Sequence, residues 1–164
     1  MQDAQVIESI LGQYRSSLAM LRQAIDACPE DLWVAENFRN RTWHMAYHTL
    51  FYAELYAHAS EAEFTPWTRH RAACRLLGAS AEELRGVTPY TREELLGYHA
   101  RCLAAVEELA PRVALDGPSG FDWLPFTKLE THIYNIGHIQ HHTGQLAERL
   151  RVAKDVGVAW VRRG

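Results

Sequence analysis

The sequence has few of the residues that mark several specialised classes of protein. Its three cysteines, Cys28, Cys74 and Cys102, lie far apart, so they fit neither a disulfide framework nor a Cys-x-x-Cys metal or redox pair. Glycine and proline account for only 10 and 6 of the 164 residues, which argues against a fibrous or disordered chain. Lysine and arginine number 17 against 20 acidic residues, and a net charge of −3 disfavours nucleic acid as a partner.

Long apolar runs are also missing. No uninterrupted stretch approaches the roughly 20 residues of a membrane helix, and residues 1–10 carry charge where a signal peptide has an apolar run. We therefore expect no membrane association and a cytoplasmic location in which the cysteines stay reduced. A length of 164 residues suits one domain, spanning 1–164.

What the sequence does contain is helical periodicity. Apolar residues recur every three or four positions between Ile7 and Ile25, and the pattern resumes over 42–60. A capping box at Thr91 and a cap formed by 127–130 indicate two further helices, expected over 91–110 and 127–152. Four long helices in a small domain predict an all-α fold, a four-helix bundle.

The connection between the second and third long helices predicts short additional helices. Thr65 and Pro66 have the form of an N-cap and a first helical residue, which predicts a short helix ending near Leu77. Ser80 and Glu83 have the form of a capping box over a single turn. At the end of the chain, only 156–161 has the composition of a short strand.

Histidine is the unusual residue, with nine in the chain. At about 100° per residue, Leu55 and Tyr52 lie within about 40° of His48, at the centre of the most apolar and aromatic face of the second long helix. Leu50 and Glu54 are expected on its far side. A buried imidazole needs partners for both ring nitrogens, or a metal and one partner.

The last long helix carries a second histidine pair. His138 and His142 are four residues apart, so both project from one face, whereas His141 should point to solvent. Two imidazoles with this spacing can chelate a single ion, and a third from another helix completes an open three-histidine site. The same face carries a polar stripe that includes Tyr134, Asn135 and Gln145.

These two segments resemble a known family. The run 138–146 (HIQHHTGQL) closely resembles the signature of the DinB/YfiT-like superfamily, whose last helix carries His-x3-His followed by one residue, Gly and Gln. The run 41–50 (RTWHMAYHTL) is similar to the second helix of that family, which supplies a single metal-binding histidine. The connection 29–33 (PEDLW) matches as well, so the resemblance covers most of the chain in order.

The resemblance implies a four-helix bundle that binds a divalent metal through His48, His138 and His142. Zinc, nickel, iron and manganese all occur in the family, and homodimers are common. Members of known activity are mostly transferases or isomerases that use bacterial low-molecular-weight thiols, while many others are described as metal-dependent hydrolases. The resemblance therefore predicts a thiol-dependent S-transferase acting on a small electrophilic molecule.

Two alternatives stay open: a metal-dependent hydrolase, or a non-catalytic, stress-linked metal-binding or scaffold protein. His44, one turn before His48, is expected to support the site or to lie in the core rather than to bind the metal. His132 is expected on a solvated or packing face. The remaining candidates either orient the imidazoles and line a pocket or are simple helix contacts; they are Tyr52, Tyr134, Asn135 and Gln145.

Overall fold

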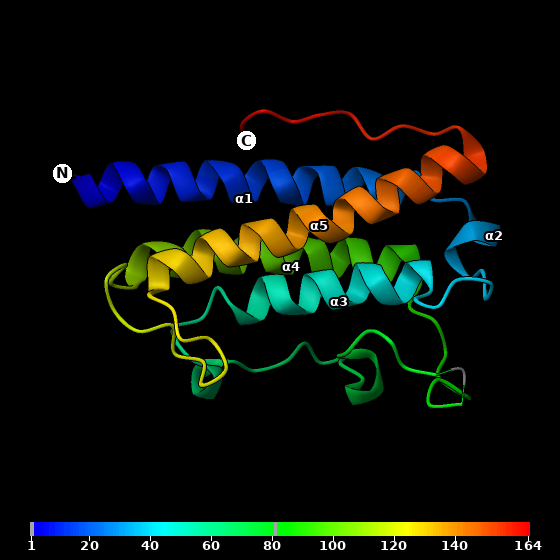
Figure 1. Cartoon of the computed structure of the whole chain (residues 1–164), viewed down its shortest axis with the longest axis horizontal. Helices are drawn as coiled ribbons and strands as arrows, with labels where there is room; N and C mark the ends of the chain where they lie inside the picture. The colour runs from blue at the N-terminus through cyan, green and yellow to red at the C-terminus, as the bar shows by residue number, and fades with distance from the viewer. Residues whose placement is uncertain (1, 81) are drawn as a thin grey trace.

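Four long helices lie side by side in the computed structural model, which describes residues 2–80 and 82–164 (Figure 1). The helices α1 and α5 run in one direction and α3 and α4 in the opposite one. The described ranges contain no strand, so the all-α prediction is confirmed. The long helices span α1 (Gln2–Asp26), α3 (Thr42–Leu55), α4 (Arg92–Leu109) and α5 (Lys128–Lys154).

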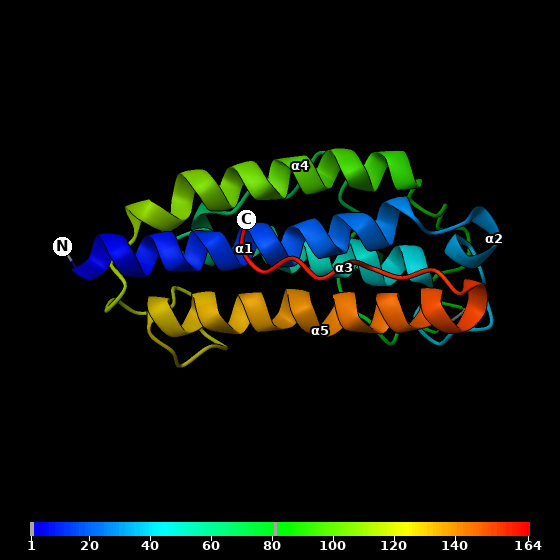
Figure 2. The same cartoon turned by 90° about the horizontal axis from the view of Figure 1, so that it is seen from above.

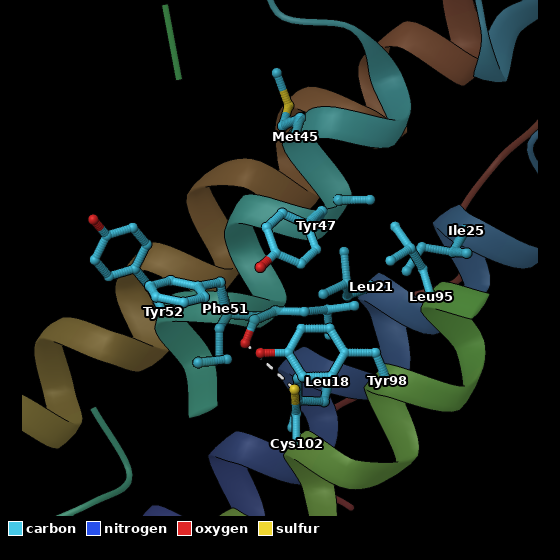
Figure 3. Close-up of a cluster of buried hydrophobic side chains, with 14 of the residues drawn as sticks. Leu18, Leu21, Ile25, Met45, Tyr47, Phe51, Tyr52, Leu95, Tyr98 and Cys102 are labelled. Atoms are coloured by element: carbon cyan, nitrogen blue, oxygen red, sulfur yellow. Dashed lines mark hydrogen bonds between the residues drawn. The ribbon is translucent and has the colours of Figure 1, made fainter. Parts of the chain in front are cut away.

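Each long helix packs against two others. Both α1 and α3 contact α4 and α5, which places α1 and α3 at opposite corners (Figure 2). The core lies between the helices, where Leu18 and Leu21 of α1 face Tyr47 of α3 and Leu95 of α4 (Figure 3). This packing brings the middle of α3 against the middle of α5.

The helix starts follow the local signals. The Thr91 hydroxyl accepts a hydrogen bond from Glu94 N, and the Glu94 carboxylate accepts one from Thr91 N, so the predicted capping box is formed. The Thr127 hydroxyl caps α5 by accepting from Glu130 N. A single helical turn, α2 (Glu30–Trp33), precedes α3 where no periodicity was evident.

Helix α3 is buried on every side, which corrects one expectation. All of its residues are buried, Leu50 and Glu54 included, because the irregular chain of residues 56–80 and 82–91 covers the face turned away from α4 and α5 (Figure 1). The buried Glu54 carboxylate accepts hydrogen bonds from the Tyr98 hydroxyl at 2.8 Å and from Arg101 Nε at 2.6 Å. Glu54 is thus an interior ion-pair residue and not a solvent-facing one.

The predicted helix from Pro66 to Leu77 is wrong. Between Pro66 and Leu77 the only helical element is the short 3₁₀ turn η2 (Ala72–Cys74), and a second such turn, η1 (Glu61–Glu63), lies before Pro66. Trp67 stacks on Tyr98 of α4 with ring centroids 4.6 Å apart, and this packing overrides the local helix signal. The single turn at Ser80 and Glu83 is confirmed, since each residue accepts a hydrogen bond from the other's backbone N–H.

The end of the chain is extended but forms no strand, contrary to the sequence prediction. After Asp155 ends α5 in the left-handed conformation (φ 53°), the segment runs back alongside α1 and α5 (Figure 2). Both neighbours are helices, so no partner strand is present and Ala159 bonds instead to the side chain of Gln23. The prediction failed because a strand needs a second strand for its ladder.

The loop before α5 is held against the end of α3. Gly120 has a φ of +83°, and a Cβ on it would lie 1.9 Å from the carbonyl oxygen of Ala59. Its own carbonyl accepts a hydrogen bond from Glu61 N. Lys128 Nζ donates to the carbonyls of His58 and Ser119, which fastens the same two segments together.

Candidate metal centre

The contact between α3 and α5 brings three histidines together. His48 projects from the middle of α3, and His138 and His142 project from adjacent turns of α5. Their rings pack edge to face, with centroid separations of 5.1, 4.9 and 4.7 Å. His48 and His142 are buried and His138 is half-buried. The three residues that the sequence singled out therefore form one cluster.

The ring nitrogens are close enough to share an ion. One ligand atom from each histidine lies within 4.8 Å of the other two, and Nε2 of His48 is 3.1 Å from Nε2 of His138. Nitrogens bound to one zinc ion at about 2.0–2.1 Å are separated by roughly 3.3 Å in tetrahedral geometry. The His48–His138 pair thus has the spacing of two ligands on one ion, and the ligand atom of His142 lies within 4.8 Å of both.

Hydrogen bonds from Nδ1 orient two of the three imidazole rings. Nδ1 of His48 donates to the backbone carbonyl of Arg75 at 2.8 Å, and Nδ1 of His142 donates to Oε1 of Gln145 at 2.8 Å. A proton on Nδ1 leaves Nε2 as a bare lone pair, which is the form that ligates a metal. Both rings are therefore held with Nε2 ready to bind.

His138 shows why a cation fits the cluster. Its Nδ1 is buried with no hydrogen-bond partner among the described residues. A proton on Nε2 of His138 would satisfy the contact with Nε2 of His48, whereas a proton on Nδ1 brings two lone pairs face to face. With the proton on Nδ1, a shared divalent cation would take both Nε2 lone pairs, so the donor set is one that a metal ion could use.

Burial keeps these imidazoles neutral. Desolvation is the main cause that lowers the pKa of His48 to about 4, and it lowers the pKa of His138 to about 3, with the neighbouring histidines adding to the effect. Desolvation also lowers the pKa of His142, although the bond to Gln145 opposes it. Neutral imidazoles are ligands at pH 7 without first having to lose a proton.

The residues predicted to support the histidines do not all lie at the site. Gln145 holds His142, and the rings of Tyr52 and Tyr134 line the same hollow as the histidines. Asn135 does not reach the site: its Nδ2 donates to the Tyr14 hydroxyl and to the Ala53 carbonyl inside the core. The angular offset of Asn135 from His138 was enough to turn it towards α1.

His44 lies outside the cluster. Its Nε2 is hydrogen-bonded to the Cys74 carbonyl at 3.0 Å, and its ring stacks on Trp43. It therefore acts as a satisfied core histidine beside the site, in line with the favoured interpretation of the sequence. His141 is exposed, as expected, and its ring lies against that of His142.

A hollow of about 350 Å³ opens beside His48 and His138. Besides Tyr52 and Tyr134, its walls include Tyr56, Arg75 and Trp123, three residues that sequence reasoning missed. Arg75 and Trp123 come from irregular segments, where no periodicity or spacing could indicate which way they face. A larger hollow of about 870 Å³ lies near the start of α1, lined by residues such as Val6 and Leu129, and contains none of the three histidines.

Comparison of the chain with protein-family models, curated proteins and solved structures gave no match. Among the described residues, none of the helices combines the length and the apolar character needed to cross a membrane. The site is therefore interpreted from its own geometry.

Proposed function

We propose that this protein is a divalent-metal-dependent enzyme of the DinB-like kind, with His48, His138 and His142 as the metal ligands. The observation that carries the proposal is the convergence of three neutral imidazoles, two of them tethered through Nδ1 so that Nε2 faces the cluster. The motif resemblance supports the same ligand set. We further propose that the four long helices form the bundle that this resemblance implies.

The three nitrogen donors narrow the choice of metal. Imidazole nitrogens suit zinc, nickel and iron, whereas magnesium and calcium prefer oxygen ligands and manganese is the weaker match among the family's metals. A divalent cation held there would supply Lewis-acid chemistry, polarising a substrate and lowering the pKa of a water or thiol beside it. Three protein ligands leave coordination positions open for such a molecule.

The residues of the chain would perform the remaining tasks. The Arg75 carbonyl and Gln145 fix the orientation of two imidazoles, and the Tyr52 ring packs against His48 and His138, which limits access of solvent from that side. The adjoining hollow is sized for a small molecule rather than a polymer. We propose thiol transfer to a small electrophile as the reaction.

Metal binding is the first test. Protein purified without chelators should contain about one equivalent of divalent metal by elemental analysis. Replacement of His48, His138 or His142 by alanine should each abolish stoichiometric binding, while circular dichroism reports retained helices. His141→Ala is the matched control, because this exposed neighbour lies on the same helix and should keep the metal.

The reaction needs a separate assay. The metal-loaded protein should transfer bacterial low-molecular-weight thiols to a chromogenic electrophile, and the His138→Ala variant should not. Hydrolysis of a chromogenic ester without thiol would identify the hydrolase instead. A protein that binds metal stoichiometrically but is inactive in both assays would favour the non-catalytic alternative, and retention of full metal by any ligand variant would refute that ligand.

A further inference from the structure

The hollow beside the histidines has an unusual wall. The aromatic side chains of Tyr52, Tyr56, Trp123 and Tyr134 surround it. Tyr52 extends from α3 away from the core side occupied by Tyr47 and Tyr98 (Figure 3), and Trp123 Nε1 donates to the Tyr56 hydroxyl at 3.1 Å. This hydrogen bond ties Trp123 to Tyr56, and the hollow offers flat apolar surfaces to a ligand.

Arg75 supplies the positive charge of this wall. It is half-buried, and Nε donates to the Tyr52 hydroxyl at 3.4 Å, a long contact. Among the described residues no carboxylate lies within ion-pair distance of its guanidinium. The carboxylate of Glu61 acts on it only through a longer-range interaction. The fork of Nη donors is therefore available to a ligand.

The two halves of Arg75 have different tasks. Its backbone carbonyl accepts the hydrogen bond from Nδ1 of His48 and so orients a metal ligand. Its side chain lies in the adjoining hollow. A substitution of the side chain leaves the carbonyl in place, which allows the two tasks to be separated experimentally.

We propose that the hollow binds a small aromatic carboxylate, with the carboxylate on Arg75 and the ring between the aromatic walls, so that the opposite end of the ligand faces the histidines. This inference rests on the proposed metal site and assigns the substrate class of that site. A guanidinium matches a carboxylate through two parallel hydrogen bonds. The volume of about 350 Å³ is at the small end of ligand cavities, which span roughly 300–1,000 Å³.

The charges in the hollow favour an anion over the other small-molecule classes. A metal cation and Arg75 on two walls repel a cationic ligand, and a neutral one leaves the guanidinium without a charged partner. Aliphatic anions of the same charge gain less from the ring faces of Tyr52 and Tyr134. Charge and shape together thus select an aromatic anion.

Benzoate is the probe, with neutral benzamide as its isostere. Titration calorimetry on the zinc-loaded protein should show benzoate binding at least about tenfold more tightly than benzamide, as expected when a charge-assisted hydrogen bond is gained. Arg75→Met should remove this preference and keep one equivalent of zinc. Arg85→Met, a change at an exposed arginine that does not line the hollow, should alter neither.

A second measurement separates Arg75 from the metal as the carboxylate partner. Benzoate should still prefer the parent protein over Arg75→Met after zinc is removed by a chelator. Equal affinities of benzoate and benzamide for the parent, or a preference that survives Arg75→Met and disappears with zinc, would overturn the proposal. Absence of zinc from the parent would refute the proposed metal site instead, and the chelated protein would still decide whether Arg75 selects carboxylates.

Discussion

The buried network around His132 predicts how the protein responds to acid. The Asn135 amide donates to the Tyr14 hydroxyl at 3.0 Å, and the Tyr14 hydroxyl in turn lies 3.1 Å from Nδ1 of His132. All three side chains are fully buried, and Nε2 of His132 has no partner among the described residues. A protonated imidazole there would carry a buried charge and would require Tyr14 to turn its hydrogen away.

The size of the effect follows from the pKa of His132. Burial, with a smaller contribution from the charge of Lys128, lowers this pKa from 6.5 to about 4. Because the unfolded chain binds the proton more readily, the folded state loses stability as the pH falls from about 6.5 to about 4, and the contribution is fully present above that range. At about 1.4 kcal/mol per pKa unit, the loss amounts to about 3 kcal/mol.

Chemical unfolding between pH 4.5 and 7.5 measures this contribution, provided that a chelator is present throughout. His132→Gln keeps an acceptor for the Tyr14 hydroxyl but cannot titrate. Its free energy of unfolding should therefore fall less steeply as the pH is lowered, because up to one proton fewer is taken up on unfolding. Tyr14→Phe is the comparison: it lowers stability at every pH but keeps the buried, titratable imidazole, so its free energy of unfolding should still fall more steeply with acid than that of His132→Gln. Parallel curves for His132→Gln and the parent would refute the reasoning.

Three further substitutions test separate features. Gly120→Ala should lower stability by at least about 2 kcal/mol, seen as a lower Tm, because the residue has a φ of +83° and the new Cβ would meet the Ala59 carbonyl. Thr91→Ala should cost about 1 kcal/mol in urea unfolding, since it removes the capping hydroxyl of α4; an unchanged midpoint would contradict the role of the cap. Asn135→Ala should lower stability yet keep one equivalent of metal by elemental analysis, because Asn135 bonds to Tyr14 and not to the histidine cluster. Loss of metal in this variant would show that Asn135 supports the metal site.

The parts of the fold that were predictable from sequence depend on local physics. Helices α4 and α5 begin at threonines whose hydroxyls cap the first turn, and that interaction spans only three residues. The pairing of His138 with His142 is a property of one helix face. Their meeting with His48 depended on the packing of α3 against α5, which the apolar faces of the two helices could indicate but not fix.

The parts that were not predictable depend on contacts between distant segments. A helical wheel assumes one buried face, so it placed Glu54 on the far side of the helix from that face, whereas residues 56–80 and 82–91 cover this side of α3 too. Trp67 was read as part of a helix, but its stacking on Tyr98 sets the path of the chain. Arg75 could not be found because its position follows from that path and from no pattern within the segment.

The irregular segment after α3 therefore has two roles: it packs over α3, and it contributes to the candidate site. The carbonyls of Cys74 and Arg75 accept hydrogen bonds from the ring nitrogens of His44 and His48, so residues that help to cover α3 also orient the proposed metal ligand His48. The path of this irregular segment, set by its packing on α3 and α4, places both backbone acceptors beside the histidines and the Arg75 side chain in the hollow.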